Sequence, residues 1–199
     1  MNLPALTPTD GGGLCISTDA LQPADIIVST TRAFISGVIH VVTDSPISHA
    51  LLSEGNGYVI EAVGDGILRR SLGVSLADDT LAVAYRYKGL PEAAASKIVA
   101  YADAQAMRHA HYDALGAFGA GMNSNPVVCV VLLGSVCPAV AGGALANQNR
   151  FFCSELVLEA FRRVGYPITR TAPGVSSPDR IVEAYSQGVL EYVGHIITS

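Results

Sequence analysis

Residues 149–157 read NRFFCSELV, and at this stretch an uncharged, apolar region of the chain gives way to a patterned helix. Downstream of Cys153, apolar side chains recur at intervals of three and four residues, and Gly165 and Pro167 end the pattern. A cysteine in the first turn of a helix lies beside unpaired backbone amides and the positive end of the helix dipole, which favour the thiolate. Cys153 is therefore a candidate nucleophile. Free cysteine is also among the most buried residue types, so a role as a small apolar core residue stays open.

Composition and charge exclude one large class of function. The chain has 199 residues, half of them apolar and 15% charged, which predicts one domain with a substantial core. The formal net charge of -5 and the absence of any cluster of Lys and Arg argue against a nucleic-acid-binding protein.

The sequence contains no pattern typical of a metal or cofactor site. Its four cysteines are too few and too unevenly spaced for a disulfide scaffold, and no CxxC pair suggests zinc. They are Cys15, Cys129, Cys137 and Cys153. His109 and His111 are two residues apart, which does not place them on one helical face as metal ligands. We expect reduced thiols, no metal and no cofactor.

Residues 1–23 are rich in proline and glycine, so we expect an irregular N-terminal arm followed by a single catalytic domain over residues 24–199. The first residues lack the basic region and apolar run of a secretory signal. We therefore expect a protein that is cytoplasmic as made. If it acts outside that compartment, it needs a leaderless export route.

Residues 114–149 carry no charge, and we interpret them as an apolar insertion in that domain. Residues 126–146 are almost wholly apolar and long enough to cross a bilayer, for which about 20 residues are needed. Glycines and a proline interrupt the run, and no basic flank fixes an orientation. A buried helix or an apolar lid is the favoured interpretation, and membrane contact through residues 126–146 stays open.

The remaining pattern predicts a mixed α+β fold. Strands are expected over residues 24–29, 48–53, 58–63, 81–87 and 189–197, with helices over 29–42, from 91 to about 109, and after Cys153.

Residues 54–57, which read EGNG, predict a hairpin between two of these strands, with His49 on the first and Glu61 on the second. Both residue numbers are odd, so the two side chains share a face only if the loop has an odd number of residues, such as three or five. A two-residue turn of Asn56 and Gly57 would place them on opposite faces. A thiolate needs a base and a group that orients the base, and His49 and Glu61 have that chemistry. Each also has a simpler interpretation, as a hydrogen-bonded strand residue and a solvent-facing carboxylate.

Four short segments in order carry a family resemblance: ADII at 24–27, SHA at 48–50, GYVIEA at 57–62 and FCSELV at 152–157. Together they resemble the circularly permuted NlpC/P60 papain-like group, which includes the YiiX/YebB-like hydrolases and is related to lecithin retinol acyltransferases. The resemblance covers most of residues 24–182. In ordinary NlpC/P60 proteins the cysteine precedes the histidine, whereas here the histidine and the acid come first, as in the permuted branch.

The resemblance implies a permuted papain-like fold, in which a small antiparallel sheet packs against a helix with the cysteine at its N-terminus. It assigns Cys153 as the nucleophile, His49 as the general base and then acid, and Glu61 as the residue that orients His49. Acyltransferase relatives usually have a second histidine at the place of Glu61, which moves this chain towards the hydrolases.

We therefore expect a cysteine amidase or endopeptidase that works through a thioester, with bacterial peptidoglycan peptide as the substrate by family analogy. An exported antibacterial effector with an immunity protein as its partner fits that substrate. Two alternatives stay open, a lipid-directed thiol acyltransferase or lipase and a non-catalytic binding module. The sequence does not predict the oligomeric state.

Overall fold

The computed structural model describes residues 6–8, 12–31, 47, 49–63, 66–108, 111–112, 150–151, 153–173 and 176–197. Several expectations fall outside these residues. They concern the apolar insertion at 114–149, with Cys129 and Cys137, and most of the helix expected over 29–42.

A seven-stranded sheet with the order β1-β9-β6-β2-β3-β4-β5 dominates the described structure. All neighbouring strands are antiparallel except β1 and β9, which are parallel. The strands are β1 (Cys15–Ile16), β2 (Ile26–Thr31), β3 (His49–Gly55), β4 (Tyr58–Val63), β5 (Gly66–Ser71), β6 (Asp79–Tyr87) and β9 (Leu190–Ile196). Two short strands, β7 (His111–Tyr112) and β8 (Arg150–Phe151), form a separate parallel pair.

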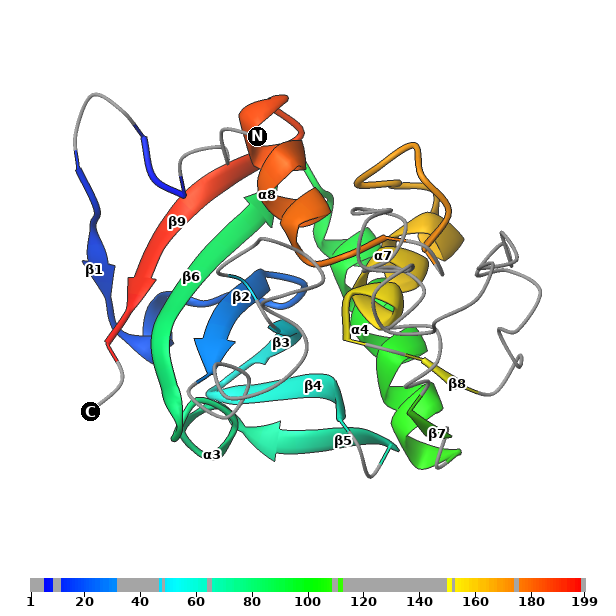
Figure 1. Ribbon diagram of the computed structural model, residues 1–199. Helices are drawn as coiled ribbons and strands as arrows, with labels where there is room; N and C mark the ends of the chain where they lie inside the picture. The colour runs from blue at the N-terminus through cyan, green and yellow to red at the C-terminus, as the bar shows by residue number, and fades with distance from the viewer. Residues whose placement is uncertain are drawn as a thin grey trace, which may run out of the picture.

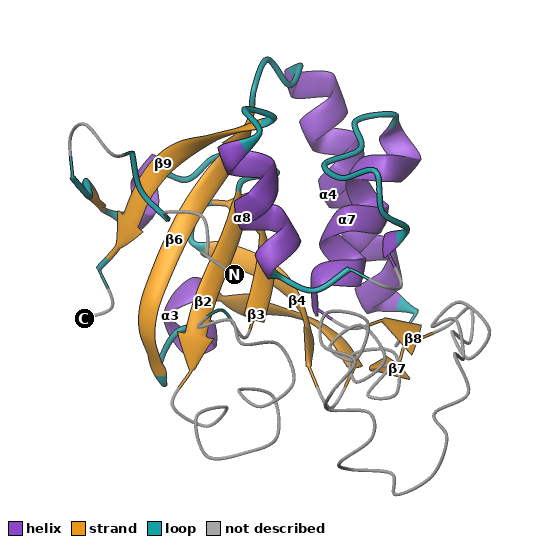
Figure 2. Cartoon of the chain, turned by 45° about the horizontal axis from the view of Figure 1, so that its top comes forward, coloured by secondary structure: helices purple, strands orange, loops and turns teal. Residues whose placement is uncertain are grey.

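The helices lie on both faces of the sheet. Figure 2 shows α4 (Glu92–Met107), α7 (Cys153–Val164) and α8 (Asp179–Ser186) on one side, and the short α3 (Leu72–Ser75) on the other. A 3-10 helix, η1 (Thr18–Ala20), follows β1. This arrangement confirms the expected mixed α+β class, although the sheet has seven strands in the described residues and is larger than expected.

The apolar core has two parts because strand side chains alternate between the two faces. The larger part joins the sheet to α4, α7 and α8 and includes Phe161, Leu156 and Ile98, all with no exposed surface. The smaller part joins the opposite face to α3 and includes Leu51, Leu72 and Leu76. The helix that begins at Cys153 therefore packs on the larger core, as its apolar stripe predicts. Figure 1 shows α4 and α7 side by side next to the sheet.

Two sequence expectations need correction at the first half of the chain. Residues 29–31 continue β2 and do not begin a helix, because they pair with β6 on one side and Ser29 pairs with β3 on the other. The segment expected to be irregular contains β1, since Cys15 and Ile16 pair with His195 and Ile196. The tertiary pairing decides the conformation of these short segments, and their local sequence does not.

None of the helices in the described segments has the length and apolarity needed to cross a membrane. Residues 126–146 lie outside those segments, so their role is a separate question.

Candidate active site

The hairpin of β3 and β4 places His49 and Glu61 on the same face of the sheet. Leu51 pairs with Glu61, and His49 is two residues before Leu51, so all three side chains point the same way. The turn consists of Asn56 and Gly57, both with positive φ (53° and 76°), as a type I′ turn requires.

A two-residue turn was expected to separate His49 from Glu61, and this expectation is wrong because the ladder contains a bulge. The pairing shifts by one residue between Ser53 and Gly55, where Gly55 adopts a φ of 80°. The last regular pair before the shift joins Ser53 to Val59, which leaves five residues between them. The bulge therefore restores the odd parity that the candidate site needs.

His49 and Glu61 form a buried, hydrogen-bonded pair. His49 Nε2 lies 2.7 Å from Glu61 Oε2, and the two residues are 8% and 2% exposed. Since Nε2 faces the carboxylate, Nδ1 is the ring nitrogen that is available to a second partner.

Cys153 is the residue placed to act as this second partner. It is the first residue of α7, is 6% exposed, and lies close enough to the His49 side chain to raise the pKa of His49. Burial by itself lowers the pKa of His49, but the hydrogen bonds and charges of Cys153 and Glu61 outweigh burial and raise that pKa to about 10. The structure thus brings together all three residues that the sequence singled out.

The other side of the Glu61 carboxylate has partners of its own. Ser75, the last residue of α3, donates its hydroxyl to Glu61 Oε1 at 2.9 Å, and Arg70 Nη1 lies 3.5 Å from the same oxygen. Burial raises the pKa of Glu61, but the hydrogen bonds from His49 and Ser75 and the charges of His49 and Arg70 outweigh it and lower that pKa. Glu61 is therefore held as a buried carboxylate.

A second acid lies close to this pair. Asp79, at the start of β6, is 9% exposed, and its Oδ2 atom has no hydrogen-bond partner among the described residues. Burial raises the pKa of Asp79, and the charge of Glu61 raises it further. A hydrogen bond with Ser29 and the charge of His49 lower the pKa but do not outweigh these effects.

Sequence reasoning did not identify Ser75, Arg70 or Asp79. The run GILRRS at residues 66–71 alternates weakly and follows β4 closely, which is the pattern of a third strand in the meander. That strand was the available sequence signal for placing Arg70 beside β4. No pattern in the sequence points to Ser75, because a helix of four residues has too few turns for a periodic signature.

The start of α7 is attached to the loop that precedes α8. Ser154 is fully buried and donates its hydroxyl to the backbone oxygen of Ser176 at 2.6 Å. This bond fixes the helix end that carries Cys153.

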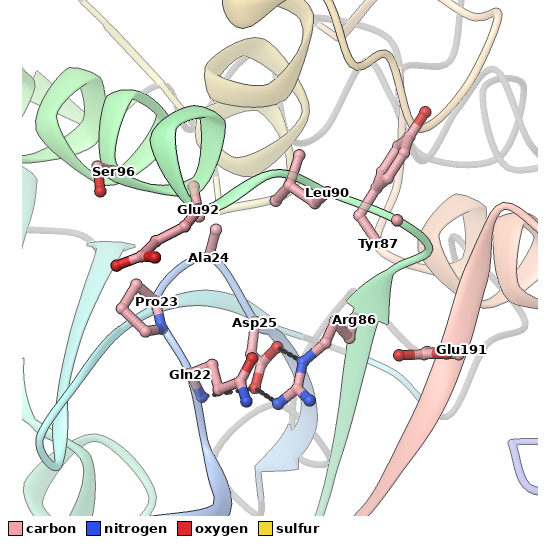
Figure 3. Close-up of a pocket in the computed structure, with 12 residues that line it drawn as sticks. Gln22, Pro23, Ala24, Asp25, Arg86, Tyr87, Leu90, Glu92, Ser96 and Glu191 are labelled. Carbon is pink, nitrogen blue, oxygen red and sulfur yellow. Dashed lines mark hydrogen bonds and ion pairs between the residues drawn. The ribbon is translucent and has the colours of Figure 1, made fainter.

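A separate hollow of about 470 Å³ lies between the start of β2, the end of β6 and α4 (Figure 3). At its floor, Arg86 donates to both carboxylate oxygens of Asp25 at 2.7 Å, so Asp25 is fully engaged. Asp25 precedes β2, whereas His49 pairs with Ser29 near the other end of that strand. The hollow is therefore distant from the site of His49, and none of His49, Glu61 and Cys153 lines it.

Comparison with known proteins agrees with this architecture. No family model matches the chain. The chain is 27% identical over 201 residues to an Escherichia coli (strain K12) protein named probable lipoprotein peptidase YaeF, and the match covers 91% of this chain and 73% of that protein. The fold of this chain is similar to that of YiiX from Escherichia coli O157:H7, with a TM-score of 0.50, 20% identity and 88% of each chain covered. The likeness to YiiX supports a YiiX-like mixed α+β fold.

YiiX is described as a metalloprotein. In the described part of this chain, no group of three or more His, Cys, Asp or Glu side chains could hold a metal ion. Both oxygens of Glu61 are already engaged, by His49 and by Ser75. In the described residues, these donors do not fit a metal site.

Proposed function

We propose that this chain is a cysteine amidase or endopeptidase, with Cys153 as the nucleophile, His49 as the general base and then acid, and Glu61 as the group that orients His49. The supporting observation is that one buried imidazole binds the Glu61 carboxylate at 2.7 Å and lies close enough to Cys153 for that residue to raise the pKa of His49. A nucleophile, its base and an orienting acid in hydrogen-bonding reach are what acyl transfer by a thiol requires. The name of YaeF as a peptidase also supports an amide substrate.

The reaction follows from these contacts. His49 Nδ1 accepts the proton of the Cys153 thiol, and the imidazolium is stabilised by the Glu61 carboxylate. The sulfur attacks the amide carbonyl carbon, and backbone amides in the first turn of α7, which have no acceptor within the helix, can stabilise the oxyanion. The imidazolium then gives its proton to the leaving amine as the carbon–nitrogen bond breaks and a thioester forms. Water, deprotonated by His49, attacks the thioester and releases the acid and the thiol.

A permuted papain-like arrangement is part of this proposal. His49 and Glu61 come from adjacent strands that precede the cysteine in the chain, and Cys153 begins a helix that packs on the same sheet.

The experiment tests the nucleophile before it tests the substrate. Alkylation by iodoacetamide at mildly acidic pH, followed residue by residue by peptide mass spectrometry, should label Cys153, because a buried thiol without activation stays unlabelled. Cys15, which is exposed, provides the internal comparison for an ordinary thiol. If Cys153 reacts no faster than Cys15 at pH 5, the catalytic assignment is wrong and a binding module is the better interpretation.

Bacterial peptidoglycan peptide is the substrate we propose, with an antibacterial effector and an immunity partner as the corresponding biological role. Purified peptidoglycan should release new muropeptides with the wild type and none with Cys153→Ala, while Cys15→Ala should behave as the wild type. Rapid alkylation of Cys153 without any new muropeptide would leave the enzyme class standing and remove this substrate.

The alternative of a lipid-directed acyltransferase or lipase rests on the apolar residues 126–146, which lie outside the described structure. Flotation with liposomes and turnover of phospholipid distinguish it, because a peptidoglycan amidase should show neither.

A further inference from the structure

Glu61 is fixed at both of its carboxylate oxygens, although an orienting acid needs only one to bind the histidine. Oε2 accepts the hydrogen bond from His49, and Oε1 is bound by Ser75 at 2.9 Å with Arg70 at 3.5 Å. A carboxylate that is bound through one oxygen can still rotate about its terminal bond, which is a broad torsion. Partners on the second oxygen stop this rotation.

Burial makes the second set of partners necessary for charge as well as for orientation. Glu61 is 2% exposed, and a buried carboxylate without sufficient hydrogen bonds takes up a proton. A protonated Glu61 would not stabilise an imidazolium at His49. The nearby acid Asp79 has the same sign of charge as Glu61 when both are ionised, and their repulsion increases the need for partners that stabilise the Glu61 carboxylate.

The position of Ser75 is determined by the packing of α3. Leu72 and Leu76 on either side of it are 2% and 3% exposed in the smaller core, and the Leu72 amide donates to the backbone oxygen of Gly57 at 2.8 Å. The helix is therefore attached to the same hairpin that carries His49 and Glu61. Ser75 is the half-buried residue that this attachment turns towards Glu61.

The register of β5 places Arg70, and not its neighbour Arg69, on the Glu61 face. Arg70 pairs with Val59, which is two residues from Glu61 on β4, whereas Arg69 pairs with Ile60. Arg69 instead binds Glu54 at 2.7 Å and lies over the Tyr58 ring at 4.1 Å. The two adjacent arginines form a natural pair of test and control.

We propose that Ser75 and Arg70 are positioning residues of this site, which hold the Glu61 carboxylate charged and in the orientation that His49 requires. The proposal rests on the proposed function, because it gives the reason why Glu61 can support a base for Cys153. Neither residue touches the substrate or the reacting atoms, so their effect passes through Glu61.

The test is the pH dependence of Cys153 alkylation by iodoacetamide in variants at each position. In Ser75→Ala and Arg70→Gln, the acid limb of the plot of alkylation rate against pH should move to higher pH by about one unit. The reason is that a hydrogen bond to a buried charge is lost and Glu61 takes up a proton more readily. Ser75→Thr, which keeps the hydroxyl, should restore the wild-type limb. Arg69→Gln and Ser71→Ala are the controls, since Arg69 lies on the other face and Ser71 makes no side-chain capping bond to α3.

A purely structural role would change the melting temperature of Ser75→Ala and Arg70→Gln and leave the acid limb in place, and this result would overturn the proposal. In assays with peptide substrate, the positioning role predicts about a tenfold lower kcat with KM almost unchanged. Equal alkylation profiles for the wild type, Ser75→Ala and Arg70→Gln would also overturn it.

If wild-type Cys153 proves unreactive at every pH, the proposed function fails while the positioning role can still be tested. The ring signals of His49, followed by NMR in Cys153→Ala, sense the protonation of Glu61 at 2.7 Å. Adding Ser75→Ala should move this acid step to higher pH. An unchanged step would overturn the positioning role on its own.

Discussion

Replacing Glu61 with glutamine removes a charge from the candidate site and keeps the size and shape of the side chain. The 2.7 Å contact corresponds to an attraction of about 6 kcal/mol at an effective dielectric constant of about 20. Burial of both groups opposes this attraction, so the net stabilisation of the ion pair is smaller. It is best followed through the pKa of the His49 imidazole.

The net effect can be worked from the pKa of His49. It rises from 6.5 to about 10, because the hydrogen bonds and charges of Cys153 and Glu61 outweigh burial. Glu61→Gln removes the charge of one of these two partners and should therefore lower the pKa of His49. A hydrogen bond to a charged group contributes about 1.5–3 kcal/mol, so the ratio of the thiolate–imidazolium pair to the thiol–imidazole pair should fall about 10- to 100-fold, with a similar loss in kcat/KM.

Two measurements check this reasoning. NMR titration of histidine-labelled protein, with His49 assigned from a His49→Gln variant, gives the pKa directly, and the rate of Cys153 alkylation at pH 7 gives the reactivity. Glu54→Gln is the matched control, because Glu54 lies on the same hairpin but binds Arg69, which is about half exposed (48%). A folded Glu61→Gln protein with the titration and alkylation rate of the wild type would refute the coupling between Glu61 and His49.

Three further predictions concern stability. Arg86→Met leaves the fully buried Asp25 without its ion-pair partner. Because the Arg86 side chain is 27% exposed, we expect the free energy of unfolding in urea to fall by only about 2 kcal/mol. Asp25→Asn in the same background should recover part of this loss. Gly194→Ala places a Cβ atom 2.5 Å from Ile16 Cγ2, so β1 should separate from β9 and become sensitive to limited proteolysis, with about 1–3 kcal/mol lost. Burial raises the pKa of Asp79, so the ionised acid lowers the stability of the protein as the pH rises above the ordinary Asp pKa of 3.8. Asp79→Asn should therefore be more stable than the wild type at about pH 7 but not at about pH 3. Melting temperatures at both pH values test this.

Residues with a strong local pattern were predicted well by the sequence. Cys153 follows from the amphipathic stripe of α7, which is long enough to show its period. His49 and Glu61 follow from a hairpin signal, EGNG, between two strand-like runs. Their catalytic roles stay predictions until Cys153 has been assayed.

The features that were missed depend on contacts distant in sequence. The bulge at Gly55 needs a positive φ that glycine permits but does not demand, so the letters alone leave two registers open. The strand β1 has two residues and exists because β9 offers its edge. Ser75 reaches Glu61 because Leu72 and Leu76 fix a single helical turn, and tertiary packing rather than propensity stabilises so short a helix.

The bulge in the first hairpin also limits how this protein can evolve. Surface loops usually accept insertions and deletions easily. Removal of one residue from 54–58 would instead change the parity of the hairpin and send Glu61 to the face opposite His49. Relatives that keep a histidine and an acid at these places should vary freely in the composition of this loop and change its length by even numbers of residues.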